Sequence, residues 1–286
     1  MSGDSLAALA GRIAELAACP PGTTLPDDAE LTATDLLRRL ETGEIRAAQR
    51  DHDGTWRAVP WVKQGILVAF RVGKVVAVDP QNTSSFSFFD KHTLPTRQFT
   101  LGDGVRVVPG GSSVRAGAYV APGVVCMPPM YINVGAHVGT GTMVDSHALV
   151  GSCAQIGERV HLSAAAQIGG VLEPINAAPV IIENDVIVGG NCGVYEGTVV
   201  RESAVLGAGV VLTRGTPVYD LVRETVYRGS AEAPLEIPAG AVVVPGARGL
   251  RQGWGASHGL ALQTPVIVKY RDEKTDLATT LEAWLR

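Results

Sequence analysis

One aliphatic residue recurs every six positions along the middle of the chain. Ten such residues run from Val114 to Ile168, and after a slip of two residues seven more run from Ile182 to Val218. All seventeen are Val, Ile or Leu except Cys126. This period matches neither an amphipathic helix, at about 3.6 residues, nor a half-buried strand, at about two. It is typical of a hexapeptide-repeat parallel β-helix, in which three short strands form each coil of a triangular prism.

The positions between these aliphatic residues are mostly small, as a narrow prism requires. The residue four places after each aliphatic one is expected to fill a tight inner corner (Ala118, Ala136, Thr142, Ala148, Ala154, Val160, Thr198 and Ala204). Glycine often follows the aliphatic residue directly, and we expect it to supply backbone freedom for the turns (Gly139, Gly151, Gly157, Gly169, Gly189 and Gly207). Because one repeat cannot bury its apolar face alone, several coils must stack and be capped at both ends. The periodicity itself does not determine handedness.

Composition narrows the classes of function. The net charge of −4 argues against nucleic acid or an anionic membrane as the main partner. The four cysteines are far apart and form no CxxC pair, so we expect reduced, mostly buried thiols. The chain shows no signal peptide and no apolar run of membrane-spanning length, which predicts a cytoplasmic protein.

The chain divides into three parts. Residues 1–104 are expected to form an N-terminal, mostly helical α/β domain, with helices around 6–16 and 34–43 and a segment at 61–70 that is helix or strand. The β-helix spans 105–220, interrupted at 172–180 by an excursion out of the wall. Residues 221–286 form a small C-terminal β/α cap, with strands at 241–244 and 265–270 and a closing helix at 275–284.

Three charged residues stand out in or next to a repeat that otherwise consists mostly of aliphatic and small side chains. Asp145 replaces the usual Gly or Ala after an aliphatic position, and is either a turn cap or a site residue. Glu196 is either a solvated wall carboxylate or a second site acid. Arg106, just before the first clean repeat, either binds an anionic substrate or caps the prism. These alternatives remain open on spacing alone.

Neither the histidines nor a search for common catalytic motifs identifies a further catalytic residue. His137, His147 and His161 lie on the prism, but no acidic residue is placed by obvious spacing to orient them, which favours structural or cofactor-contacting roles. The sequence holds no GxSxG elbow, Walker loop or HExxH pair, so nothing supports a metal-dependent mechanism. Arg248 and Arg251, on a Gly-rich segment, are either loop cations in solvent or contacts for the phosphates of coenzyme A.

Several sequence blocks carry a family resemblance: Phe70-Arg71, Phe89-Asp90-Lys91, Arg106-Val-Val-Pro109, and above all the segments within 141–174. Together they resemble the tetrahydrodipicolinate N-succinyltransferases of diaminopimelate and lysine biosynthesis. The resemblance implies a homotrimer of left-handed β-helices with active sites in the clefts between neighbours. It also implies succinyl-CoA as cosubstrate, with no permanently bound cofactor and no metal. By position, Arg106 and Asp145 correspond to the substrate-binding arginine and aspartate of the family.

Two departures from the family pattern affect these expectations. The family often carries a second active-site Glu where this chain has Gly193, and usually has Gly-Gly where this chain has Ala164-Ala165 with Gln167 nearby. A paralogue that uses acetyl-CoA or a related amino-acid substrate is therefore an alternative. A non-catalytic or metal-binding hexapeptide trimer is a further alternative, but His137, His147 and His161 are not spaced to occupy equivalent positions of successive coils.

Overall fold

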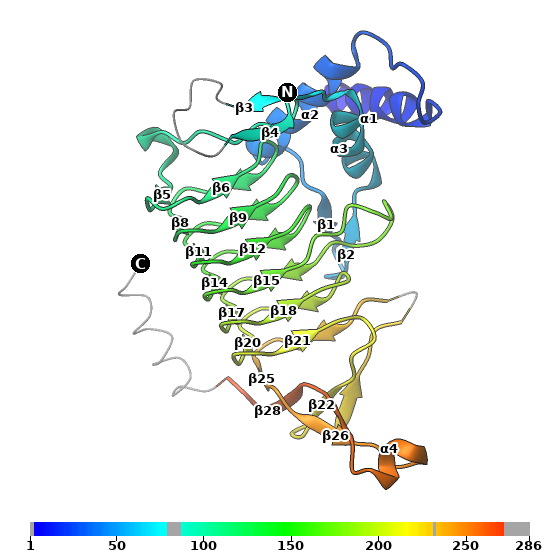
Figure 1. The fold of residues 1–286 in the computed structure, drawn as a ribbon, viewed down its shortest axis with the longest axis vertical. Coiled ribbons are helices and arrows are strands. Elements are labelled where there is room, and N and C mark those ends of the chain that lie inside the picture. Colours follow the sequence, from blue (N-terminus) through cyan, green and yellow to red (C-terminus); the bar gives the residue numbers. More distant parts are fainter. Residues whose placement is uncertain (1–2, 79–86, 231–232, 272–286) are drawn as a thin grey trace.

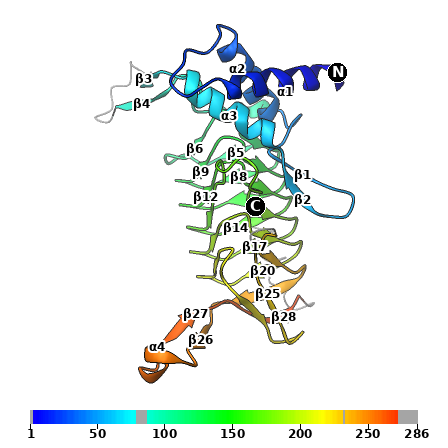
Figure 2. The same ribbon diagram turned by 90° about the vertical axis from the view of Figure 1, so that its right-hand side faces the viewer.

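The computed structural model describes residues 3–78, 87–230 and 233–271. A triangular prism of stacked coils forms the body of the molecule, with a helical domain at one end and small strands at the other (Figure 1). A two-stranded hairpin of the helical domain extends along one side of the prism (Figure 2). The described part is thus the expected left-handed parallel β-helix with additions at both ends.

The N-terminal domain packs three helices, α1 (Gly3–Ala18), α2 (Ala29–Glu41) and α3 (Pro60–Val72). The segment that the sequence left open as helix or strand is α3, because Pro60 begins it and Val62, Ile66 and Ala69 share one buried face. Two antiparallel hairpins complete the domain: β1 (Ala48–Arg50) with β2 (Trp56–Ala58), and β3 (Val75–Val78) with β4 (Phe88–Lys91). A short 3-10 helix (Leu101–Asp103) leads into the prism.

Three parallel sheets form the walls of the prism, and we name each by its surroundings. The hairpin wall, beside β1 and β2, contains β7 (Tyr119–Val120), β10 (His137–Val138), β13 (Gln155–Ile156), β16 (Ile181–Ile182), β19 (Val199–Val200) and β24 (Glu236–Ile237). The third wall contains β6 (Ser113–Val114), β9 (Tyr131–Ile132), β12 (Leu149–Val150), β15 (Gln167–Ile168), β18 (Gly193–Val194) and β21 (Val211–Leu212).

The long wall is the remaining sheet. Its parallel strands are β5 (Arg106–Val107), β8 (Val125–Cys126), β11 (Met143–Val144), β14 (His161–Leu162), β17 (Ile187–Val188), β20 (Val205–Leu206) and β25 (Ala241–Val244). The C-terminal strands β28 (Val266–Tyr270), β22 (Val218–Asp220) and β23 (Thr225–Tyr227) extend it. Because β24 and β25 pair with β19 and β20, the walls continue to Val244, beyond the expected boundary at residue 220.

The core of the prism confirms the ladder read from the sequence. The recurring aliphatic residues from Val114 to Leu212 are buried and stack coil on coil, as Val138, Ile156 and Ile182 do. The prediction is wrong for Val218, which is buried on β22 beside β23 and β28, while Ile237 stacks on Val200 in its place. The small residues expected at the inner corners are buried as well, each at most 2% exposed. Apolar burial of this kind is the dominant stabilising term in folding.

The role expected for the glycines after the ladder residues is wrong. None of them has a positive φ. Positive φ occurs two residues later, as at Gly141 and Arg159. Gly139 is needed for space instead: a Cβ there would lie 2.6 Å from the carbonyl carbon of Gly157 in the next coil. These glycines therefore permit the close stacking of coils rather than the turn conformation.

The excursion at 172–180 leaves the wall as expected, and the helical domain anchors it. Lys63 of α3 is fully buried and donates from Nζ to the carbonyl oxygen of Ala177, at 2.5 Å. Burial lowers the pKa of Lys63. The excursion is thus tied to α3 by a charge-assisted hydrogen bond.

The C-terminal part projects beyond the end of the prism as β26 (Ala247–Gly249), β27 (Ala261–Gln263) and the short helix α4 (Gly253–Ser257) (Figures 1 and 2). The expected strands at 241–244 and 265–270 are present as β25 and β28. The helix expected at 275–284 lies outside the described residues. No helix in the described ranges is long and apolar enough to cross a membrane.

All four cysteines are free thiols, as expected from their spacing. Cys126, Cys153 and Cys192 are buried, and burial raises the pKa of Cys126 and of Cys153 to about 12. These two thiols are consequently protonated and unreactive at neutral pH.

Candidate active site

Asp145 lies in the turn between the long wall and the third wall, directly after β11. Its Oδ1 accepts a hydrogen bond from the Ser146 amide at 2.7 Å, which is the turn-capping role considered for it. Its Oδ2 lies 3.9 Å from Nε2 of His161. The side chain is 29% exposed, so solvent reaches the carboxylate. Asp145 therefore caps its turn and also presents an oxygen beside a histidine.

The sequence placed His161 on the prism, but its pairing with Asp145 was missed. His161 on β14 is in register with Met143 on β11, so it lies beside the strand that ends at Asp145. Three repeats of six residues separate these partners, which is one coil of the prism. Counting eighteen residues forward from Met143 would have identified the pair.

Arg106 lies on the long wall, which also contains the strand β11 that ends just before Asp145. It belongs to β5, and β8 separates β5 from β11. Adjacent strands are about 4.8 Å apart, so the two strands are separated by roughly 10 Å. Arg106 is exposed and forms no ion pair with any residue in the described ranges. The long wall thus carries a cationic and an anionic group that face solvent, two strands apart.

Gly193 is on β18 of the third wall, and the side chain of Tyr195 covers it. A Cβ at Gly193 would lie 2.8 Å from the phenolic oxygen of Tyr195 and 2.9 Å from its Cζ. The phenol therefore occupies the space that any side chain at this position would need. At the place where the resemblance predicts a carboxylate, the wall presents a tyrosine ring.

Glu196 already has a backbone partner at its corner of the prism. It is an exposed corner residue with φ of 54°, and its Oε2 accepts a hydrogen bond from the Arg214 amide at 3.0 Å. This geometry favours the reading of a wall carboxylate in solvent.

The second departure from the family pattern, Ala164-Ala165 in place of Gly-Gly, lies one coil from Asp145. The Ala165 amide donates to the carbonyl oxygen of Ser146 at 2.8 Å, so the turn of Ala164 and Ala165 stacks on the turn of Asp145. Gln167 donates from Nε2 to the carbonyl oxygen of His147 at 3.1 Å. A change in these turns therefore re-lines the wall next to the Asp145 carboxylate.

The other histidines lie elsewhere on the prism. His137 is on the hairpin wall, where its ring stacks on Tyr119 with centroids 4.4 Å apart. Burial and the charge of Arg46 lower the pKa of His137 to about 3, which makes it a weak base at neutral pH. His147 is an exposed corner residue with φ of 62°. Within the described ranges, no group of three or more His, Cys, Asp or Glu residues has the arrangement of a metal site.

Arg248 and Arg251 lie together at the far end of the molecule. They line a cavity of about 830 Å³ with Tyr219 and Gln252, next to the projecting β26 and α4. Nε of Arg248 is buried and has no hydrogen-bond partner among the described residues. The structure therefore brings the two predicted cations to one hollow.

Comparison with known proteins agrees with this architecture. Residues 21–72 match the family described as tetrahydrodipicolinate N-succinyltransferase N-terminal, and residues 179–214 match the hexapeptide repeat of succinyl-transferase. A crystal structure from Campylobacter jejuni, titled as a putative 2,3,4,5-tetrahydropyridine-2-carboxylate N-succinyltransferase, shares the fold with a TM-score of 0.50 and 18% identity. The alignment covers 87% of this chain and 64% of that one.

Curated relatives are much closer in sequence. The 2,3,4,5-tetrahydropyridine-2,6-dicarboxylate N-succinyltransferase of Bradyrhizobium diazoefficiens is 39% identical over 257 residues, with 88% of each chain covered. The enzyme of the same name from Polynucleobacter asymbioticus is 40% identical, with 91% of each chain covered. That from Nitrobacter winogradskyi is 41% identical, with 87% of each covered. The chain is therefore an acyltransferase that belongs to the tetrahydrodipicolinate N-succinyltransferase family.

Proposed function

We propose that the protein transfers a succinyl group from succinyl-CoA to the amine of tetrahydrodipicolinate, in its opened 2-amino-6-oxopimelate form. The observation that carries this proposal is the match of nearly the whole chain, helical domain and prism together, to enzymes named for that reaction. The reaction belongs to diaminopimelate and lysine biosynthesis, and it takes place in the cytoplasm, where succinyl-CoA is available.

The two charged groups of the long wall suit an amino dicarboxylate. The guanidinium of Arg106 can form paired hydrogen bonds with a substrate carboxylate. The carboxylate of Asp145 can receive the substrate amine and favour its deprotonation during attack. The amine nitrogen then attacks the thioester carbon, and backbone N–H groups of the turns stabilise the resulting oxyanion. The carbon–sulfur bond breaks, which yields the amide, and the proton lost by the nitrogen goes to the thiol of CoA.

The active form in this proposal is a homotrimer. One chain presents Arg106 and Asp145 on an open wall, and a cleft for acyl-CoA needs a second wall opposite. Arg248 and Arg251, in their common hollow, are the proposed contacts for the CoA phosphates. Sedimentation should give three times the mass of one chain; a monomer at micromolar concentration would contradict the shared site.

A second candidate keeps the fold and changes the acyl donor or the amine. Tyr195 over Gly193 and the alanine turn beside Asp145 are the observations that favour it. Thiol release should be measured with succinyl-CoA and with acetyl-CoA, each with and without the cyclic substrate. Turnover of succinyl-CoA that depends on the cyclic substrate supports the first candidate. Turnover of acetyl-CoA, with none of succinyl-CoA, supports the second.

Replacing Asp145 tests the mechanism directly. Asp145→Asn retains an oxygen for the Ser146 amide, so the turn cap survives while the negative charge is lost. We expect kcat/KM to fall about 100-fold, the usual scale for losing one acid–base group. Asp185→Asn is the matched control, because Asp185 is another corner aspartate but pairs with Arg159 on the surface. Activity of Asp145→Asn within threefold of wild type would restrict Asp145 to its capping role.

A further inference from the structure

A cavity of about 360 Å³ lies between the β1–β2 hairpin and the hairpin wall. Arg46, Trp56, Tyr119, His137 and Gln155 form its inner part. The reaction site proposed above lies on the long wall and its corner with the third wall, so this cavity is on a different side of the prism. Its volume falls in the range of small-molecule sites.

Arg46 is the group in this cavity that lacks a counterpart. Its Nε donates to Oε1 of Gln155 at 2.9 Å, and its guanidinium lies 5.6 Å from the centroid of the Trp56 ring. It forms no ion pair with any residue that the structure describes, and its two terminal nitrogens donate no hydrogen bond to those residues. By contrast, Arg39, another buried arginine of the helical domain, forms ion pairs with both Asp35 and Glu44.

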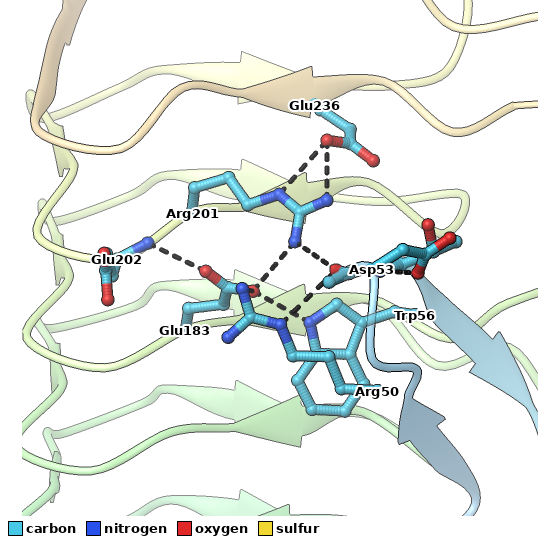
Figure 3. A network of polar contacts seen from close by, with 9 residues as sticks. Arg50, Asp53, Trp56, Glu183, Arg201, Glu202 and Glu236 are labelled. Carbon is cyan, nitrogen blue, oxygen red and sulfur yellow. Dashed lines mark hydrogen bonds and ion pairs between the residues drawn. The ribbon is translucent and has the colours of Figure 1, made fainter.

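Glu183, the buried carboxylate that lines this cavity, already has its hydrogen-bond partners. Glu183 is 6% exposed, and it accepts hydrogen bonds from Trp56 Nε1 at 2.9 Å and from Arg201 at 3.0 Å. Its second oxygen accepts from the Glu202 amide at 3.1 Å. Figure 3 shows Glu183 between these donors, with Glu236 on the far side of Arg201. Glu183 therefore supports the docking of the hairpin and leaves Arg46 uncompensated.

An uncompensated cation in a partly buried cavity is costly, because desolvation opposes its charge. That cost appears as a pKa of Arg46 lowered to about 10 by burial. The guanidinium still carries its charge at neutral pH, and its free edge has the fork geometry that matches a carboxylate. A bound carboxylate would supply the counter-charge that none of the described residues provides.

The rest of the cavity defines the other end of a ligand. Tyr119, Trp56 and His137 provide flat faces for a short apolar stem. Nδ1 of His137 is buried without a hydrogen-bond partner in the described ranges. Glu202 and Glu158 add exposed carboxylates at the rim, which favour a cationic group, and one oxygen of Glu158 also pairs with Arg159 at 2.9 Å. We infer that this cavity is a second binding site, separate from the reaction site, for a small amino acid whose carboxylate pairs with Arg46 and whose amine faces the rim carboxylates.

Such a ligand would contact both the hairpin and the prism, so binding should stabilise their junction. Three probes of matched length separate the contributions: 5-aminopentanoate, pentanoate and pentylamine. By titration calorimetry on the full chain, we expect 5-aminopentanoate to bind with a Kd on the order of 1 mM or tighter. Pentanoate should bind more weakly and pentylamine not measurably. Equal binding of pentylamine, or no binding of either carboxylate at about 10 mM, would overturn the inference.

Amino-acid substitutions test whether 5-aminopentanoate binds at Arg46 or elsewhere on the molecule. Arg46→Gln should weaken binding of 5-aminopentanoate at least about tenfold, the scale expected for one charge-assisted pair. Arg57→Gln makes the same change on the same hairpin, at an exposed residue paired with Asp51, and should bind as wild type. Arg106→Gln should also bind as wild type, because Arg106 is on the long wall.

A blocking variant covers the case in which Arg46→Gln fails to fold. Thr140 is an exposed residue at the edge of the cavity, so Thr140→Trp should obstruct it while leaving Arg46 in place. Loss of binding in a folded Thr140→Trp protein supports the site. Undiminished binding in Thr140→Trp, or in a folded Arg46→Gln protein, would place the ligand elsewhere and refute the assignment.

Discussion

His137 should make the protein sensitive to mild acid. Burial and the charge of Arg46 lower its pKa from 6.5 to about 3 in the folded chain. Below pH 6.5 the unfolded chain takes up a proton at this position and the folded chain does not, so stability is present in full above pH 6.5 and is lost as the pH falls toward 3. At about 1.4 kcal/mol for each pH unit, the loss is on the order of 5 kcal/mol near pH 3 and about 2 kcal/mol at pH 5.

The assay compares wild type with His137→Phe. Phenylalanine keeps a ring to stack on Tyr119 and removes the ionisable nitrogen. Chemical denaturation at pH 7 and at pH 5, at one protein concentration, should show wild type losing about 2 kcal/mol more than the variant. The other charged groups that line the cavity are Arg46, Arg50 and the carboxylates Glu158, Glu183 and Glu202. They are the same in both proteins, so their titration cancels.

His52→Phe is the control, because His52 is an exposed histidine in the turn of the hairpin that covers this cavity. Its loss between pH 7 and pH 5 should match that of wild type. If wild type and His137→Phe instead lose stability in parallel, the reasoning about burial of His137 is refuted.

Three further predictions concern the prism, the third wall and the C-terminal hollow. Gly139→Ala should destabilise the protein by about 3 kcal/mol or more in denaturant titrations, because the new Cβ meets backbone of the next coil; a neutral result would show that the coils can separate. Gly193→Glu should fold, since the three atoms nearest to a new Cβ all belong to the movable Tyr195 ring, and should alter the relative kcat/KM for acyl donors or amines; unchanged preferences would remove this position from the site. Replacing Arg248 and Arg251 with Gln should raise the KM for acyl-CoA, with a smaller effect at high salt, and an unchanged KM at low ionic strength would exclude both from CoA binding.

The ladder of the prism was predictable because one aliphatic residue per strand must point inward whatever the rest of the chain does. The role of Gly139 was not, since a glycine required for positive φ and a glycine required for space look the same in a sequence. The return of the repeat at Ile237 and Val243 also escaped the periodic search. A long stretch after Leu212 breaks the count, and only strand pairing reveals that the coil resumes.

Some residues of the two proposed sites could be predicted from the sequence, and others could not. Asp145 and Arg106 were candidates because charged side chains are rare on the prism. Their proximity to one wall follows from the coil period, which brings β5 and β11 into the same sheet. The cavity around Arg46 had no sequence signal, because Arg46 and Gln155 are 109 residues apart and meet only when the hairpin docks. Contacts between separately folded segments depend on tertiary packing, which no local pattern encodes.

One wall of the prism is covered by the β1–β2 hairpin, whereas the other two carry the proposed reaction site. This difference affects how the departures from the family pattern can act on substrate specificity. The hairpin wall is held by the hairpin through Trp56 and Glu183. The long and third walls carry Asp145 and the turn of Ala164 and Ala165, as well as Tyr195 lying over Gly193. Both departures from the family pattern therefore lie on the side of the proposed reaction, away from the hairpin. Changes confined to the reaction side alter the lining of the proposed site without weakening the scaffold, so the acyl-donor and amine comparisons are the measurements on which they should act.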